Sequence, residues 1–394
     1  MKVGVVRETY PGEHRVALVP NSVPALSKLG LEVLLEPGAG QAAGYLDQEY
    51  IAKCAHIAGS RAEVFEQADL ILQVRCLGAN QEQGKLDLAA CRSAHTVIGC
   101  CDPLGAPEYA HEMSNTGVRV IAMELMPCIS RAQSMDVLSS MATLAGYKAV
   151  LMAASLLPKM FPMMMTAAGT ITPAKVFVIG AGVAGLQAIA SARKLGAVVQ
   201  AYDVRPAVKE QCESLGAKFV EMELASESSE GAGGYAKQMD EDFYRRQREL
   251  MTQVVAQSDV VITTALIPGA KAPMLITEEA VGGMSPGSVI IDLAAEGGGN
   301  CALTQAEKTT QAHGVTIMGP INLASAIPFH ASQMYAKNLA AFLQNLIQEG
   351  EIHLNQEDPI IADTLLTHQG EVVNPRLRER LELSDSEPAG NPKE

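Results

Sequence analysis

Three closely spaced glycines are the residues of this sequence best suited to hold a ligand. Gly180, Gly182 and Gly185 directly follow the apolar run Lys175–Ile179, and an Ala-rich helical pattern, Val183–Leu195, comes next. In such a GxGxxG pattern the first glycine permits a tight turn, the second lets backbone amides approach a pyrophosphate, and the third lets the helix pack on the strand. The glycines alone are weak evidence, but this strand and helix around them predict a dinucleotide site at the helix N-terminus.

An acidic residue follows at the distance that a ribose ligand requires. The next apolar run, Val198–Tyr202, ends at Asp203, which stands 18 residues after Gly185. A carboxylate there accepts hydrogen bonds from an adenosine ribose and repels a 2′-phosphate, so Asp203 favours NAD(H) over NADP(H). Arg205, two residues further on, is the residue that could instead pair with such a phosphate.

A second group of polar residues lies in 130–140, at the start of an apolar helical pattern. Asp136 has the residue type of a helix N-cap, with Ser139 and Ser140 on the following turn. The same side chains could hold polar atoms of a ligand. The residues by themselves leave both interpretations open.

The composition argues against a nucleic-acid partner and against metal chemistry. The 394 residues include 30 Lys and Arg against 44 Asp and Glu, a net charge of −14, whereas a phosphate-backbone binder needs a basic face. Trp is absent, so stacking platforms for single strands are not expected. The eight histidines show no spacing for catalytic triads or metals. The eight cysteines form no CxxC pair, which predicts reduced thiols in a cytoplasmic protein.

Short apolar runs alternate with helical patterns along most of the chain, which is typical of parallel sheets covered by helices. Long helices are expected at 136–157 and 332–348. The sequence therefore predicts an α/β fold with two Rossmann-like parallel-sheet domains around a cleft. Strands are expected at Val3–Val6, Glu32–Leu35, Leu70–Val74, Thr96–Ile98, Val118–Ala122, Val176–Ile179, Val198–Tyr202, Lys218–Val220, Val260–Thr263, Val289–Asp292 and Thr316–Met318.

The chain order predicts how these elements divide into domains. We expect a discontinuous first domain, residues 1–137 with 322–378, and a Rossmann domain over 138–321. The polar end of the chain, 379–394, is expected to be disordered. The stretch Glu223–Gly234 is rich in Ser, Glu and Gly without an apolar period, which predicts a mobile surface loop.

No membrane span is expected. The apolar stretch Ala149–Met165 is interrupted by Pro158 and Pro162, well short of the ~18 uninterrupted apolar residues of a span. We expect a buried helix that ends at a proline turn instead.

Several sequence blocks, taken together with the glycine pattern, carry a resemblance to a known family. The chain resembles the NAD(H)-binding alpha subunit, or domain I, of the proton-translocating NAD(P) transhydrogenases, within the alanine dehydrogenase-like superfamily. The similar blocks are RAQSMDVLSSMATLAGYKAV (131–150), AYDVR (201–205), GGYAK (233–237), TTALIPGAKAP (263–273), IDLAAEGGGN (291–300) and SQMYAKNL (332–339).

The resemblance implies a function and partners. The chain would hold NAD(H), a partner domain would hold NADP(H), and hydride would pass directly between the two nicotinamides. A membrane-spanning component would couple the transfer to proton translocation. The resemblance further implies a homodimer, and a cytoplasmic location peripheral to the inner membrane through partner subunits. Direct hydride transfer needs orientation and exclusion of water from the protein rather than an acid or base.

The resemblance also assigns roles to residues of this sequence. Gln133, Asp136 and Ser139 would hold the dihydronicotinamide and its ribose, and Tyr235 would fold over the bound nucleotide, so these four are expected at the reacting centre. Gln247, Ala265 and Leu266 would line the adenosine side. The full set expected to bind the cofactor is Arg131, Gln133, Asp136, Ser139, Gly180, Gly182, Val183, Gly185, Asp203, Val204, Arg205, Gly234, Tyr235, Gln247, Ala265 and Leu266.

One position departs from the family pattern. The family usually carries an arginine three residues before Arg131 to contact the nicotinamide carboxamide, and this chain has Cys128 there. A neutral thiol cannot replace the several donors of a guanidinium. Either Arg131 swings in, or the ring is held less tightly and hydride transfer is slow.

Two alternatives remain. In an alanine dehydrogenase, Arg15 would stand at the substrate-carboxylate arginine and Arg75 would replace a lysine. That chemistry needs a proton donor, usually a histidine, where this chain has Cys100 and Cys101, and Glu296 occupies the place of a catalytic aspartate. The second alternative is a non-catalytic NAD-binding regulatory module, which the missing arginine favours.

Overall fold

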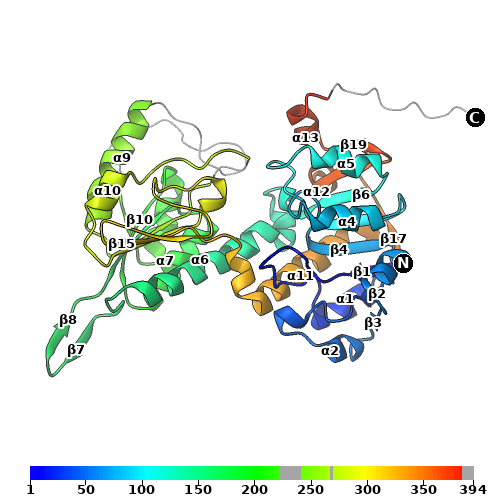
Figure 1. Cartoon of the computed structure of the whole chain (residues 1–394), viewed down its shortest axis with the longest axis horizontal. Coiled ribbons are helices and arrows are strands. Elements are labelled where there is room, and N and C mark those ends of the chain that lie inside the picture. The colour runs from blue at the N-terminus through cyan, green and yellow to red at the C-terminus, as the bar shows by residue number, and fades with distance from the viewer. Residues whose placement is uncertain (222–240, 267–268, 384–394) are drawn as a thin grey trace, which may run out of the picture. The chain divides into compact units, whose positions relative to one another are not determined.

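The computed structural model describes residues 1–221, 241–266 and 269–383, with side chains described from residue 245 onward in the second range. The chain forms two compact units. One is Met1–Leu138 together with the described part of Pro328–Glu394, and the other is Ser139–Ile327. The chain thus leaves the first unit once and returns to it (Figure 1).

The first unit is built on an eight-stranded sheet in the order β19-β18-β6-β5-β4-β1-β2-β3. Its six N-terminal strands are parallel. Their order, third-second-first-fourth-fifth-sixth, is that of a doubly wound nucleotide-binding fold. The strands are β1 (Lys2–Val5), β2 (Glu32–Leu35), β3 (His56–Ile57), β4 (Leu70–Arg75), β5 (Thr96–Cys100), β6 (Arg119–Ala122), β18 (Leu365–His368) and β19 (Glu371–Val372).

Helices cover this sheet, and the C-terminal segment extends its edge. The predicted helix at 332–348 is α11, which begins at Pro328, four residues earlier than expected, and ends before the short strand β16 (Ile347–Gln348). Strand β18 joins β6 antiparallel, which the alternation of apolar runs did not predict. The helices are α1 (Val23–Ser27), α2 (Asp47–Ile51), α3 (Arg61–Gln67), α4 (Gln83–Ala90), α5 (Tyr109–Asn115), α11 (Pro328–Leu346), α12 (Pro359–Thr364) and α13 (Pro375–Arg380), and β17 (Glu351–Ile352) pairs with β16.

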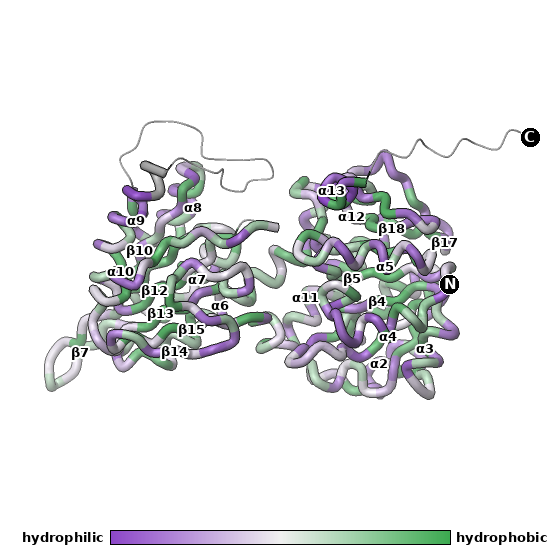
Figure 2. The backbone as a smooth tube through the Cα atoms, turned by 45° about the horizontal axis from the view of Figure 1, so that its top comes forward, coloured by the Kyte–Doolittle hydropathy of each residue, from purple (hydrophilic) through white to green (hydrophobic). Residues whose placement is uncertain are grey.

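The parallel strands of the second unit follow the same order. Its seven-stranded sheet runs β11-β10-β9-β12-β13-β15-β14, parallel except for β14 at one edge. The central strands are almost continuous runs of β-branched residues because both faces are buried, and Figure 2 shows them in hydrophobic colours. The strands are β9 (Lys175–Ile179), β10 (Val198–Tyr202), β11 (Lys218–Phe219), β12 (Val260–Thr263), β13 (Val289–Asp292), β14 (Thr309–Ala312) and β15 (Val315–Met318). The predicted α/β class with two Rossmann-like sheets is confirmed.

The helices of the second unit pack around an apolar core. Val176 and Val178 of β9 contribute to this core together with Ala188 and Ile189 of α7. The helices are α6 (Val137–Leu156), α7 (Val183–Lys194), α8 (Lys209–Ser214), α9 (Glu241–Ala256) and α10 (Glu278–Gly282).

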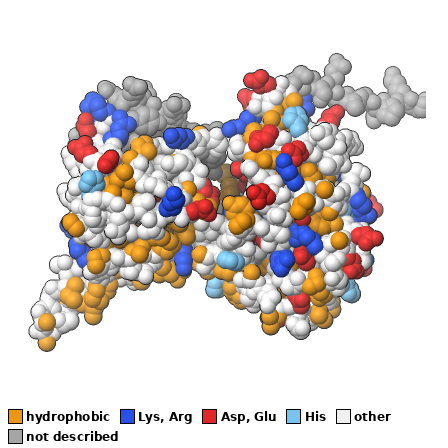
Figure 3. Space-filling model, in the orientation of Figure 1, with side chains coloured by type: hydrophobic (Ala, Val, Ile, Leu, Met, Phe, Trp, Pro, Cys, Tyr) orange, Lys and Arg blue, Asp and Glu red, His pale blue; other side chains and the backbone are white. Residues whose placement is uncertain are grey.

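The helix predicted at 136–157 is α6, and it ends just before Pro158, as expected for the apolar stretch Ala149–Met165. Helix α6 ends at Leu156, and residues 164–171 form an antiparallel hairpin of β7 (Met164–Thr166) and β8 (Gly169–Ile171). The hairpin carries exposed apolar side chains, of which Met165 is 80% exposed, and orange side chains mark it in Figure 3. Within the described residues, α6 alone has the length and apolar composition of a membrane-crossing helix, criteria that a buried core helix also meets.

The last residues differ in part from the expected disordered tail over 379–394. Glu379 and Arg380 close helix α13, and Leu381 and Leu383 pack against the core of the first unit. Residues 384–394 lie outside the described part of the chain, as do Gly234, Tyr235 and the predicted loop Glu223–Gly234.

Candidate functional site

The glycine pattern forms a tight loop between β9 and α7. Gly180 has a φ of +93°, and a Cβ built there would lie 2.6 Å from the Thr264 hydroxyl. A Cβ on Gly185 would lie 1.8 Å from the Gly180 carbonyl oxygen, whereas Gly182 has open space around it. Gly180 and Gly185 are therefore required by packing, and Gly182 leaves room in front of the helix.

The N-terminus of α7 is suited to an anion. Gly182 is the N-cap residue, with extended backbone and no side chain to cap the helix, and Val183 after it is 42% exposed. The first N–H groups of a helix have no partner inside the helix and carry a partial positive charge. This terminus lies where β9 has β10 on one side and β12 on the other, the point at which doubly wound sheets bind ligands.

Asp203 ties the glycine loop to the end of β10. One carboxylate oxygen accepts a hydrogen bond from the Ala181 backbone N–H at 2.7 Å. Arg205 donates to both oxygens, from Nε and Nη2 at 2.9 Å, and its backbone N–H adds a third bond. The Asp203 side chain is only 6% exposed, against 17% for Arg205. Asp203, the acidic group predicted to meet the ribose, is thus held against the glycine loop, and the Arg205 side chain is folded onto it. Val204 lies between the two in the sequence.

Gln247 supplies a buried polar atom without a partner among the described residues. This side chain of α9 is 2% exposed, and its Nε2 donates to the Tyr202 hydroxyl at 3.1 Å while Oε1 has no hydrogen bond. Burial raises the pKa of Tyr202 to about 12. An orphaned buried acceptor is costly in a folded protein, so this end of β10 fits a polar ligand.

Ala265 and Leu266 follow β12, and two residues that the sequence analysis missed hold Ala265. Asn300 accepts from the Ala265 N–H at 3.0 Å and donates to its carbonyl at 2.9 Å. Asp292, fully buried at the end of β13, accepts from the Asn300 N–H at 2.8 Å. Leu266 remains 46% exposed. A sequence signal for Asp292 and Asn300 does exist. Asp292 is an acidic residue at the end of an apolar run, and the three consecutive glycines 297–299 directly precede Asn300.

The polar residues of the segment 130–140 begin in a 3-10 turn, Ser130–Met135. Asp136 follows as the residue before α6. Gln133 is exposed, and Ser139 lies in the first turn of α6, in the second unit. Arg131 pairs with both oxygens of Asp358 and donates to Asn345 at 3.2 Å. Burial acts to raise the pKa of Asp358, but its hydrogen bonds, with that from Arg131 first, lower it.

Cys128 lies close to this turn and is exposed. Because the Arg131 side chain is paired with Asp358, it does not point toward a ligand in place of the arginine that the family usually carries where this chain has Cys128.

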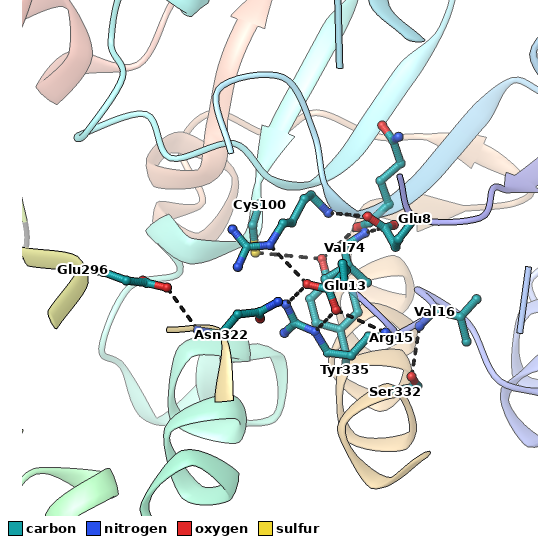
Figure 4. A network of polar contacts seen from close by, with 12 residues as sticks. Glu8, Glu13, Arg15, Val16, Val74, Cys100, Glu296, Asn322, Ser332 and Tyr335 are labelled. Atoms are coloured by element: carbon teal, nitrogen blue, oxygen red, sulfur yellow. Dashed lines mark hydrogen bonds and ion pairs between the residues drawn. The ribbon is translucent and has the colours of Figure 1, made fainter. Parts of the chain in front are cut away.

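A separate buried network lies in the first unit (Figure 4). Arg15 donates to Glu13 at 2.7 and 2.6 Å, and Arg75 donates to the same carboxylate at 3.1 Å. Burial alone would raise the pKa of Glu13, but hydrogen bonds from Arg15 bring it down to about 2. Arg15, at the position of the substrate-carboxylate arginine of an alanine dehydrogenase, and Arg75, at the position of a lysine, therefore both hold a carboxylate of the chain itself.

Cys100 lies beside this network, with its sulfur 4.0 Å from the Tyr335 hydroxyl, which bonds to the Gln73 carbonyl at 2.9 Å. Burial raises the pKa of the Cys100 thiol well above its usual value, so the thiol holds its proton and is a poor donor. Glu296 belongs to the second unit, where it accepts from the Asn322 N–H at 3.2 Å. Within the described ranges no group of three His, Cys, Asp or Glu side chains could hold a metal ion.

Known proteins similar to this chain cover nearly its whole length. Alanine dehydrogenase/PNT domain patterns match residues 4–145 (N-terminal domain) and 149–375 (C-terminal domain). The first segment of NAD(P) transhydrogenase subunit alpha from Rhodospirillum rubrum is 46% identical over 380 residues, 96% of this chain and 99% of that protein. The crystal structure of transhydrogenase from Sinorhizobium meliloti matches 95% of this chain and 100% of that one, at 45% identity and a TM-score of 0.82. Alanine dehydrogenase of Mycobacterium tuberculosis is 28% identical over 406 residues, 99% of both chains.

Proposed function

The chain belongs to the alanine dehydrogenase/PNT family, and from this premise we propose that it is the NAD(H)-binding component of a proton-translocating NAD(P) transhydrogenase. In this role it passes hydride from NADH to NADP+ held on a partner domain. Similarity to transhydrogenase alpha subunits supports an NAD(P) transhydrogenase component of the oxidoreductase class. The observation that carries the proposal is the joining of the glycine loop to Asp203 at the switch point of the second sheet.

The residues of the second unit fit an adenine dinucleotide. The N-terminus of α7 receives the pyrophosphate, with Gly182 leaving room for its approach. Asp203 receives the adenosine ribose, and the unpartnered oxygen of Gln247 and the fixed backbone of Ala265 line the same end. When bound, the dihydronicotinamide supplies the hydride.

The protein's part in the reaction is to orient the ring and exclude water. Holding two reactants in line contributes up to about 7–11 kcal/mol to lowering a barrier. We assign this work to Gln133, Asp136 and Ser139 at the nicotinamide, and to Tyr235 over the nucleotide. No acid or base is needed for direct transfer. Cys128 weakens the hold on the ring, because Arg131 is engaged with Asp358.

The partners follow from the resemblance to transhydrogenases. The NADP(H)-binding domain and the membrane-spanning component reside on partner subunits, and the chain forms a homodimer. It acts in the cytoplasm, at the inner membrane, through these subunits. The name of the Rhodospirillum rubrum relative, which numbers it as one segment of subunit alpha, supports an assembly with further components.

The test is reduction of an NADP analogue by NADH. Purified protein is mixed with NADH, thio-NADP+ and the partner subunits, and the reduced analogue is followed by its absorbance. We expect product only when this chain and the partners are both present. Binding of NADH without any transfer would contradict the transhydrogenase assignment and favour a regulatory module.

An amino-acid dehydrogenase is the second candidate, and the observation behind it is the similarity to alanine dehydrogenases over nearly the whole chain. Turnover of NADH with pyruvate and ammonia, in the absence of partners, would establish it. We expect none, because the buried thiol of Cys100 holds its proton.

A further inference from the structure

Helix α11 holds the backbone of the turn that carries Gln133. The side-chain Nδ2 of Asn338 donates to the Ser134 carbonyl oxygen at 2.8 Å, a bond between residues 204 positions apart in the chain. Asn338 is only 5% exposed, and its Oδ1 has no hydrogen-bond partner among the described residues. The side chains of Gln133 and Ser134, by contrast, are exposed. A buried amide therefore fixes one peptide of a turn whose polar side chains remain accessible.

The turn needs support from outside because its own hydrogen bonds are poor. Ser130–Met135 is a 3-10 segment of 6 residues without a side-chain cap, and 3-10 runs longer than about three or four residues are uncommon. The bond that closes it, from the Asp136 N–H to the Gln133 carbonyl, is long at 3.4 Å. Ala132 and Met135 are buried and anchor its apolar side. The bond from α11 adds a directional hold that apolar contacts lack.

A second hold on the turn is weaker. Arg131 pairs with Asp358 and donates to Asn345 at 3.2 Å. Asn345 stands two helical turns after Asn338, so the two amides lie on one face of α11. The Arg131 side chain is 53% exposed, and water screens an exposed ion pair, whereas the hydrogen bond of a buried amide is stronger than in water. Of the two holds, the Asn338 bond therefore has the larger influence on the backbone next to Gln133.

We infer that Asn338 is a positioning residue for hydride transfer, acting through the turn that presents Gln133 and Asp136 to the nicotinamide. The inference rests on the proposed function, which assigns these two side chains to the reacting ring, and it adds a residue outside the expected binding set. Asn338 contacts no ligand in this role. Because a displacement of about 1 Å at a reacting centre can lower a rate about a hundredfold, a small shift of the turn is enough to slow the transfer.

The experiment uses the full chain with its partner subunits and the variant Asn338→Leu. Leucine has a similar branched shape. It removes the donor to Ser134 and also the unpartnered buried oxygen, so the free energy of unfolding should change little. With NADH at a saturating concentration, the rate of thio-NADP+ reduction should fall about tenfold or more. Gln344→Leu, at an exposed position of the same helix, is the matched control and leaves the rate unchanged.

Two ligands distinguish positioning from a general structural defect. ADP-ribose shares the adenosine, the pyrophosphate and the second ribose of NADH but lacks the nicotinamide. In Asn338→Leu, calorimetry should show an affinity for NADH that is about threefold or more weaker, as for part of one hydrogen bond. The affinity for ADP-ribose should stay unchanged. Equal losses for the two ligands would show a structural role only and overturn the inference.

The inference and the proposed function can fail separately. If the unaltered chain transfers hydride with its partners and Asn338→Leu does so equally fast, the inference alone is wrong. If the unaltered chain transfers no hydride, the proposed function is overturned and the inference with it. Should Asn338→Leu not fold, Asn338→Ala takes its place, because the smaller side chain also lacks the donor and cannot clash.

Discussion

Asn300 donates its backbone N–H to the buried carboxylate of Asp292 at 2.8 Å, and its side chain in turn holds both backbone groups of Ala265. Asp292 accepts four further hydrogen bonds, from two hydroxyls and two backbone N–H groups. A buried charge is tolerated only when such bonds replace its water. The Asp292 carboxylate thus fixes the backbone conformation of the loop after β13. Through Asn300 it also fixes the loop after β12.

Replacing Asp292 with Ala is expected to destabilise the second unit. Five donors lose their acceptor inside the protein, so the free energy of unfolding should fall by about 3 kcal/mol or more. Urea denaturation measures the change. Thr304→Val removes one donor and is expected to cost only about 1 kcal/mol. Equal losses in the two variants would show that the carboxylate does not organise the loops.

Gly185 and Gly182 should respond to alanine in opposite ways. The Cβ of Gly185→Ala meets the Gly180 carbonyl, so the free energy of unfolding should fall by about 2 kcal/mol. The Cβ of Gly182→Ala meets nothing in the protein but stands where a pyrophosphate would approach. Stability should then change by less than about 0.5 kcal/mol, while NADH affinity falls about tenfold. Unchanged NADH binding in Gly182→Ala would argue against the pyrophosphate position.

The buried Glu124 predicts a pH dependence of stability. Burial raises its pKa from 4.5 to about 7, and one of its oxygens has no hydrogen-bond partner among the described residues. Between these values the folded chain binds more protons than the unfolded chain. The contribution of Glu124 to the free energy of unfolding therefore falls as the pH rises from 4.5 to about 7, by at most about 1.4 kcal/mol per pH unit.

Glu124→Gln should flatten this part of the profile, because the amide stays neutral and its oxygen still accepts from the Cys101 and Asp102 N–H groups. Thermal denaturation at several pH values between 4 and about 8 measures the slope. Glu66→Gln, at an exposed position, is the control. A profile that matches that of the unaltered chain would mean that the pKa of Glu124 is the same in the folded and the unfolded chain.

Cys128→Arg is expected to speed hydride transfer to an NADP analogue in the presence of the partner subunits. A guanidinium at this position offers donors to the nicotinamide carboxamide that Arg131, paired with Asp358, does not supply. The rate should rise about tenfold, as for one well-placed charge-assisted bond. Cys54→Arg introduces the same side chain at another exposed cysteine and should leave the rate unchanged. No gain in Cys128→Arg would indicate that Arg131 already contacts the ring.

The sequence by itself determined the buried parallel strands of the two sheets and the glycine loop. The strands at Val198–Tyr202, Val260–Thr263 and Val289–Asp292 have the predicted bounds, because buried parallel strands are continuous apolar runs that local pattern reveals. The roles of Gly180 and Gly185 could be predicted from their spacing together with the strand and helix on either side, since the strand–loop–helix geometry they permit is local.

The tertiary structure decided which polar groups meet. Gln247 reaches Tyr202 across 45 residues, and Asn300 reaches Ala265 across 35. The pairing of Arg205 with Asp203 is local, yet whether the carboxylate also holds the glycine loop depended on β9 and β10 lying side by side. Hydrogen bonds need atoms within about 3 Å, and only the packed sheet brings distant parts of the chain to that distance.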